Sequence, residues 1–205
     1  IRYKSDSSII SAKKYDELQS TSNKKPFICQ YDRKKIILIR EEEHILKITL
    51  NENENDDITI ENKGSISYKL FSLQCKYEQN KYIITYLDGG QYKIEVYDDS
   101  NSIGTFAETS DNSMIFSSCF FVDGSHILCI NVLSSQTNYV YYELSGNSLI
   151  QKNTGNLISE NSHENIGAII KYWSNQEILM CINSKTSDID LYCHMINVYP
   201  NGDTI

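Results

Sequence analysis

Short apolar runs alternate with short polar stretches along the whole chain. The apolar runs are rich in Ile, Tyr and Val, and the polar stretches between them are rich in Asn, Asp, Gly and Ser. Residues of the first kind favour pleated, half-buried strands, and residues of the second kind favour turns. The pattern therefore predicts an all-β protein built from antiparallel hairpins.

The same order of runs occurs four times. In each copy an aromatic residue is followed six positions later by Ile: Tyr31 and Ile37, Tyr77 and Ile83, Phe121 and Ile127, and Tyr172 and Ile178. The copies start at Cys29, Cys75, Cys119 and Ile170, so the period is about 45 residues. Each copy contains two apolar runs, a third run, and a shorter, more polar fourth. Four strands at this period form one blade of a β-propeller, and blades stack face to face to complete their core.

We therefore expect residues 1–205 to be one β-propeller portion with about four four-stranded blades. The expected units are 25–65, 66–112, 113–160 and 161–205, and residues 1–24 are expected to be the end of a preceding blade and a loop. Because the pattern begins and ends inside a unit, we expect a larger ring of roughly six to eight blades. A closed ring of four blades and a β-sandwich are the alternatives.

The units resemble kelch and WD-type propeller repeats in strand order and period. The resemblance does not extend to the motifs, because Trp173 is followed by Ser174 and the double glycine Gly89-Gly90 stands in a hairpin after the second run. It carries over no functional residues. It implies a ring that binds a partner through its loops.

The chain is acidic, with a net charge of −8 and a pI of about 5.0. Binding to a nucleic-acid backbone needs a basic face, so we expect no nucleic-acid partner. No stretch approaches the roughly 20 apolar residues of a membrane span, so we expect none in this segment. The bias toward Asn, Lys, Ile and Tyr resembles proteins encoded by AT-rich genomes.

The six cysteines divide into two groups. Cys29 and Cys75 occupy the same position in neighbouring units, and we expect free, buried thiols there, since such positions should lie too far apart for a disulfide. Cys119 and Cys129 should face each other across one turn, and Cys181 and Cys193 across another. Each of these pairs is a candidate cross-strand disulfide. Disulfides would imply the secretory route, whereas free thiols would favour the cytosol, and the intracellular side is slightly preferred.

A second observation on the compartment is ambiguous. The chain has 19 Asn and 35 Ser plus Thr, yet it contains no Asn-x-Ser/Thr acceptor for an N-linked glycan. A surface protein that lost such sites under selection and an intracellular protein that lacks them by chance both fit.

Two groups of residues contain metal-binding side chains but do not have the spacing of a zinc site. They are Cys119, His126 and Cys129, and Cys181, Cys193 and His194. Structural zinc needs four ligands, usually with closely spaced cysteine pairs, and the chain has no C-x-x-C or H-x-H pair. We therefore expect no metal and no cofactor.

No catalytic residues are expected either. The chain lacks a G-x-S-x-G sequence and a phosphate-binding loop. The carboxylate pairs Asp56-Asp57 and Asp98-Asp99 should be solvated in turns. The recurring aromatic position of Tyr31, Tyr77, Phe121 and Tyr172 predicts packing between blades, with a ligand-contacting ring around the channel as the alternative.

The expected function is a non-catalytic interaction scaffold that presents its loops to a protein partner. The candidate contact loops are Asn51–Asp57, Ser100–Asn112 and Asn153–Asn165. The alternative is a secreted or cell-surface recognition or adhesion module that binds protein or glycan. A third hypothesis is an enzyme whose active site lies mostly outside this segment.

Overall fold

We analysed the protein in a computed structural model. It describes residues 2–3, 9–11, 26–40, 44–51, 58–65, 69–76, 79–99, 101–109, 114–134, 136–158, 168–174, 177–183 and 191–197. All secondary structure in this part of the chain is β, so the all-β prediction is confirmed. These described segments include no helix long and apolar enough to cross a membrane.

The strands follow one another as four antiparallel units. Blade 1 consists of β3 (Pro26–Asp32), β4 (Lys35–Arg40), β5 (His44–Leu50) and β6 (Ile58–Ser65). Blade 2 consists of β7 (Lys69–Lys76), β8 (Lys81–Asp88), β9 (Gln91–Asp98) and β10 (Asn101–Thr109). Blade 3 consists of β11 (Met114–Phe121), β12 (His126–Leu133), β13 (Thr137–Ser145) and β14 (Ser148–Ile158). Blade 4 shows β15 (Ala168–Ser174), β16 (Glu177–Asn183) and β17 (Leu191–Asn197), and β1 (Arg2–Tyr3) pairs with β2 (Ile9–Ser11).

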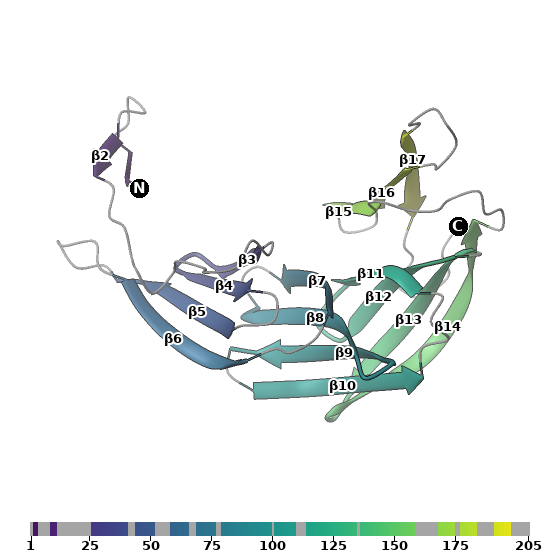
Figure 1. Ribbon diagram of the computed structural model, residues 1–205, viewed down its shortest axis with the longest axis horizontal. Coiled ribbons are helices and arrows are strands. Elements are labelled where there is room, and N and C mark those ends of the chain that lie inside the picture. Colours follow the sequence, from purple (N-terminus) through teal and green to yellow (C-terminus); the bar gives the residue numbers. More distant parts are fainter. Residues whose placement is uncertain are drawn as a thin grey trace.

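The blades succeed one another around an arc, and the first strand of each lies on its concave side (Figure 1). The first strands β3, β7, β11 and β15 contact their neighbours in that order, which is the arrangement of propeller blades around a centre. Blades 2 and 3 are also joined at their outer strands, because β10 and β14 form a parallel bridge between Thr105 and Ser148. The β-propeller prediction therefore holds.

Local turn chemistry sets the hairpin registers. The β8–β9 connection consists of Gly89 and Gly90, which have φ of 56° and 81°, and Asp88 pairs with Gln91 across it. Two successive residues with positive φ form a turn whose twist matches that of the strands, and glycine adopts this conformation without steric cost. The double glycine therefore forms the two-residue turn of this hairpin.

The core lies between the blades, where one face of each sheet packs on the next. Blades 1 and 2 share a cluster around Tyr31, Ile37, Ile39, Leu73, Tyr82 and Ile84. Blades 2 and 3 share one around Phe71, Tyr92, Ile94, Phe121, Ile127 and Tyr142. Blades 3 and 4 meet through Leu128, Ile130, Tyr141 and Ile196. In the second strands β8 and β12, alternate side chains thus pack on one neighbouring blade and the intervening side chains on the other.

One of the predicted contact loops is largely strand, and the expectation of a loop is wrong there: within Ser100–Asn112, strand β10 spans Asn101–Thr109 and pairs along its length with β9. Within Asn153–Asn165, strand β14 continues to Ile158, and residues 159–165 lie outside the described part. Their Ser, Thr, Gly and Asn residues are typical of loops, but outer strands with one exposed side accept them. Of Asn51–Asp57, residues 52–57 lie outside the described part, as do Tyr77 and residues 203–205.

Candidate functional site

A disulfide joins the first strands of blades 1 and 2. It links Cys29 on β3 to Cys75 on β7, which are 46 positions apart in sequence and have their Cα atoms 5.7 Å apart. Both side chains are half-buried at the edge of the cluster between these blades. The bond therefore ties together two sheets that share no strand pairing.

The expectation of free thiols at Cys29 and Cys75 is wrong. It assumed that equivalent positions of neighbouring blades are too far apart, whereas the first strands of blades 1 and 2 converge near the centre of the arc (Figure 1). Cα separations of about 5.5–6 Å are the most common in disulfides, and 5.7 Å falls in that range. Convergence of the first strands is a property of the assembled ring, not of one blade.

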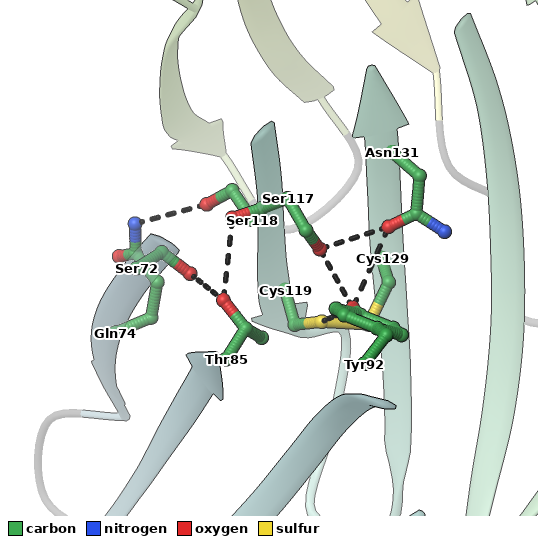
Figure 2. The surroundings of a disulfide bond; sticks show 9 residues. All are labelled: Ser72, Gln74, Thr85, Tyr92, Ser117, Ser118, Cys119, Cys129 and Asn131. Carbon is green, nitrogen blue, oxygen red and sulfur yellow. Dashed lines mark hydrogen bonds between the residues drawn. A yellow bond between two sulfur atoms is a disulfide. The ribbon is translucent and has the colours of Figure 1, made fainter. Parts of the chain in front are cut away.

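A second disulfide links Cys119 on β11 to Cys129 on β12, within one hairpin of blade 3 (Figure 2). The two residues are direct cross-strand partners with Cα atoms 4.0 Å apart, and both are fully buried. In blade 4, Cys181 and Cys193 are opposite each other in the β16–β17 register, and Cys193 is disulfide-bonded. Among the described residues no cysteine is free.

A buried chain of polar groups lies beside the Cys119–Cys129 bond (Figure 2). The Ser72 and Thr85 hydroxyls of blade 2 are 2.7 Å apart, and Thr85 Oγ1 donates to the Ser117 carbonyl of blade 3 at 3.2 Å. Ser117 Oγ donates to Asn131 Oδ1 at 2.8 Å and lies 2.6 Å from the Tyr92 hydroxyl. Because Ser117 has a single hydroxyl proton, Tyr92 is the donor in that last bond.

These polar groups are inaccessible and neutral. Ser117, Thr85 and Tyr92 are each 0% exposed, and burial raises the pKa of Tyr92 above its ordinary value of 10 despite the bond to Ser117. A phenol that stays protonated is a permanent donor. This series of hydrogen-bonded side chains therefore connects blades 2 and 3. Because the buried polar groups in it have hydrogen-bond partners, burying them does not carry a large free-energy cost.

An ion cluster joins blades 1 and 2 farther from the centre. Asp99, at the end of blade 2's third strand, accepts from Lys47 Nζ at 2.8 Å, from the Tyr31 hydroxyl at 2.9 Å and from Lys35 Nζ at 3.4 Å. Partial burial works against ionisation of Asp99, but the bonds from Lys47 and Tyr31 outweigh it and hold its pKa below 3.8. Asp99 lies in a turn and its side chain is 40% exposed, as expected, but its pairing with two lysines of blade 1 was not predicted from the sequence.

The β11–β12 turn holds Asp123, Ser125 and His126. Asp123 Oδ2 lies 2.7 Å from His126 Nδ1, and its other oxygen accepts the backbone N–H groups of Ser125 and His126. These bonds keep the pKa of Asp123 below its ordinary value, although burial acts the other way. Lys81 of blade 2 donates to the Gly124 carbonyl at 2.8 Å, so the turn is also an inter-blade contact.

This turn does not have the geometry of a nucleophilic triad. A catalytic histidine contacts its nucleophile through one ring nitrogen and its carboxylate through the other. Here Ser125 Oγ at 3.4 Å and Asp123 both lie at Nδ1 of His126. The described residues also contain no group of three His, Cys, Asp or Glu side chains that could hold a metal ion.

The recurring aromatic position packs between blades where it is described. Tyr31 is fully buried in the cluster of blades 1 and 2, where its ring lies 5.9 Å from that of Tyr82, and Phe121 is buried between blades 2 and 3. The side chains of Tyr77, Tyr172, His163 and His194 lie outside the described part of the structure.

Comparison with known proteins finds similar structures but no similar sequences. No protein-family model and no curated protein matches the sequence. Solved structures do match, among them the α-L-arabinofuranosidase PaAbf62A from Podospora anserina in complex with cellotriose, with 9% identity and a TM-score of 0.49. The alignment covers 94% of this chain and 69% of that one.

Two functional expectations are corrected against this comparison. The matched structure is an enzyme that binds an oligosaccharide, which contradicts the expectations of a non-catalytic scaffold and of no enzymatic activity. Neither expectation is kept. At this identity and TM-score the likeness transfers no activity, substrate or functional residue to this chain.

Proposed function

We propose that this chain is a secreted or cell-surface recognition module that binds a protein or a glycan. The observation that supports it is the oxidised state of the cysteines: Cys29–Cys75, Cys119–Cys129 and the bonded Cys193. Such bonds form and persist in oxidising compartments and are rare where glutathione keeps thiols reduced. The secretory route therefore replaces the slight preference for an intracellular location.

The position of the bonds also supports recognition. Cys29–Cys75 joins two blades whose described strands form separate sheets, and Asp99 adds an ion cluster to the same interface. Fixing neighbouring blades lowers the conformational entropy that binding would otherwise remove. A rigid set of hairpin ends is the surface that a recognition module presents. The broad likeness to kelch and WD-type repeats, which we retain as part of the proposal, implies the same mode of binding.

The first test is a thiol count on the unreduced protein. The chain is isolated from its native cells, denatured, alkylated and analysed by mass spectrometry. We expect Cys29 and Cys75, and Cys119 and Cys129, in linked peptides without alkylation. Six alkylated cysteines would contradict the proposal.

The second test concerns recognition itself. The oxidised protein should bind saturably to intact cells or immobilised surface extracts. The same protein, after reduction and alkylation, should lose that binding if the bonds hold the recognition surface together. Linked cysteines without any saturable binding would leave the compartment correct and refute the recognition role.

A further inference from the structure

The two disulfides whose cysteines are all described join different kinds of neighbours. Cys119–Cys129 links adjacent strands of one hairpin, and the backbones of these strands are already paired in register. Cys29–Cys75 links β3 to β7, which belong to separate sheets. Opening the first bond therefore leaves a hydrogen-bonded hairpin, whereas opening the second removes a crosslink between two blades.

The two bonds also differ in their access to solvent. Cys119 and Cys129 are each 0% exposed and belong to the cluster between blades 2 and 3. Cys29 and Cys75 are only half-buried and lie at the edge of the cluster between blades 1 and 2. A thiolate that cleaves a disulfide must reach one of its sulfur atoms. We therefore expect a reductant to reach the Cys29–Cys75 bond in the folded protein, and the Cys119–Cys129 bond only when the blades open.

Non-covalent contacts keep blade 1 on blade 2 when the Cys29–Cys75 bond is open. The cluster around Tyr31, Ile37 and Ile84 buries apolar surface whether or not the cysteines are linked. Asp99 still accepts from Lys47, although solvent screens this pair and limits its contribution. The reduced protein should therefore stay folded, with blade 1 held less firmly.

The contacts between blades 2 and 3 do not involve this bond. Thr85 Oγ1 donates to the Ser117 carbonyl, and β10 and β14 form a bridge between Thr105 and Ser148. In the described part of the chain, no such strand bridge joins blade 1 to blade 2. Opening the Cys29–Cys75 bond should therefore loosen blade 1 as a unit and leave blades 2 and 3 together.

We propose that the Cys29–Cys75 bond is a redox-sensitive switch between a fixed and a loosened blade 1. A dithiol reductant opens the bond in the folded protein, while the buried Cys119–Cys129 bond stays intact. The switch goes beyond the proposed recognition function, because it gives the surface formed by blades 1 and 2 two states. The oxidised state holds the hairpin ends of both blades in one arrangement, and the reduced state lets blade 1 open more often.

The chemistry of the switch is thiol–disulfide exchange. One thiolate of the reductant attacks a sulfur of the Cys29–Cys75 bond, forms a mixed disulfide and releases the other cysteine as a thiolate, which takes up a proton from water. The second thiol of the reductant loses its proton and displaces the mixed disulfide. The bond thereby gains two electrons and two protons and becomes two thiols, and the reductant becomes a disulfide.

The first measurement is the order in which the bonds are reduced. The oxidised protein is incubated with dithiothreitol in native buffer, samples are quenched by alkylation at intervals, and the alkylated cysteines are identified by peptide mass spectrometry. We expect Cys29 and Cys75 to be alkylated at least about tenfold faster than Cys119 and Cys129, because only the first bond is reachable without opening of the blades. In denaturing urea the two rates should converge, since the difference comes from the fold.

Low concentrations of urea distinguish direct attack from attack after unfolding. The free energy of unfolding falls linearly with urea, so a reaction that requires unfolding accelerates exponentially. Below the unfolding transition, the rate for Cys29–Cys75 should stay nearly constant, and the rate for Cys119–Cys129 should rise steeply. Equal rates in native buffer, or a rate for Cys29–Cys75 that rises as steeply as the other, would overturn the switch and leave the recognition function standing.

The second measurement is hydrogen exchange before and after selective reduction. We expect the backbone amides of β3–β6 to exchange several-fold faster after reduction, with no change in β12 and β13. In the variant Cys29→Ser/Cys75→Ser this exchange should already be fast, and dithiothreitol should have no further effect. In the matched variant Cys119→Val/Cys129→Val the response to dithiothreitol should persist. Selective reduction without any change in blade 1 would overturn the switch alone, whereas six free thiols in the isolated protein would refute the recognition function as well.

Discussion

Removing the Cys29–Cys75 bond should destabilise the chain more than its half-buried position suggests. The bond closes a loop of 46 residues, whereas Cys119–Cys129 closes one of 10. In the chain-entropy model, a crosslink restricts the unfolded state more strongly as its loop grows. At 25 °C that relation gives about 4.0 kcal/mol for the longer loop and about 2.7 kcal/mol for the shorter one.

The perturbation is the double variant Cys29→Ser/Cys75→Ser. Serine is chosen because both positions are half-buried and tolerate a hydroxyl at little cost. We expect the free energy of unfolding to fall by about 4 kcal/mol, which for a domain of this size lowers the melting temperature by roughly 8–16 °C. Urea unfolding followed by circular dichroism measures the first quantity, and a thermal scan measures the second.

The matched control is Cys119→Val/Cys129→Val. Valine is used there because both positions are fully buried, and an apolar side chain of similar size preserves packing beside Tyr92. The control should lose about 2.7 kcal/mol, so the order of the two variants tests the loop argument. A loss below about 1 kcal/mol in the first variant, or a larger loss in the control, would refute the reasoning.

Two further predictions concern blade packing and charge. In Gly155→Ala the new Cβ would lie 2.7 Å from Cε1 of Tyr139, whose buried ring cannot move freely. We therefore expect the free energy of unfolding, measured in urea, to fall by about 1–3 kcal/mol. The control Gly124→Ala, whose Cβ meets nothing closer than 4.0 Å, should leave stability unchanged, and equal losses in the two variants would contradict the packing argument. The variant Asp99→Asn keeps the shape of the side chain, and asparagine tolerates the φ of 31° at this position. It should lower the free energy of unfolding by only about 1 kcal/mol at pH 7, because Asp99 is 40% exposed and solvent screens its pairs with the lysines. Since the pKa of Asp99 is lowered by folding, its contribution is present above its unfolded value near 3.8 and is lost as pH falls through the folded value; a wild-type-minus-variant difference that stays constant from pH 7 to pH 2.5 would contradict this.

The features that the sequence predicts well depend on residues that lie close together in the sequence. The hairpins of the first three blades follow from apolar runs separated by short turns, and the pairing of Cys119 with Cys129 depends on a register fixed by one turn. The ends of β10 and β14 are harder to predict from the sequence, because their Ser, Thr and Gly residues are typical of loops. Gly104 within β10 is one such residue, and its lack of a side chain is what admits Leu144 of blade 3, which a Cβ would meet at 2.3 Å.

What the sequence does not predict depends on the distance between sheets. A period of about 45 residues predicts that blades exist, but it says nothing of how closely their first strands approach. The Cys29–Cys75 bond and the contact of Asp99 with Lys47 both follow from that approach.

The interfaces between blades combine different chemistries at different distances from the centre, so the effect of removing one contact can be predicted separately for each interface. Blades 1 and 2 are joined by a disulfide at their first strands, by apolar packing behind it, and by the Asp99 cluster at β4 and β5. Blades 2 and 3 are joined by buried hydrogen bonds of Thr85 and Tyr92 with Ser117 on the first strand of blade 3, and by the β10–β14 bridge at their outer edge. Because these contacts belong to separate residues, loss of the Cys29–Cys75 bond should lower stability without displacing the contacts between blades 2 and 3. A Cys29→Ser/Cys75→Ser protein that is still folded should therefore keep the backbone amide hydrogens of β11 and β12 protected from exchange, and a loss of that protection would mean that the two interfaces are coupled.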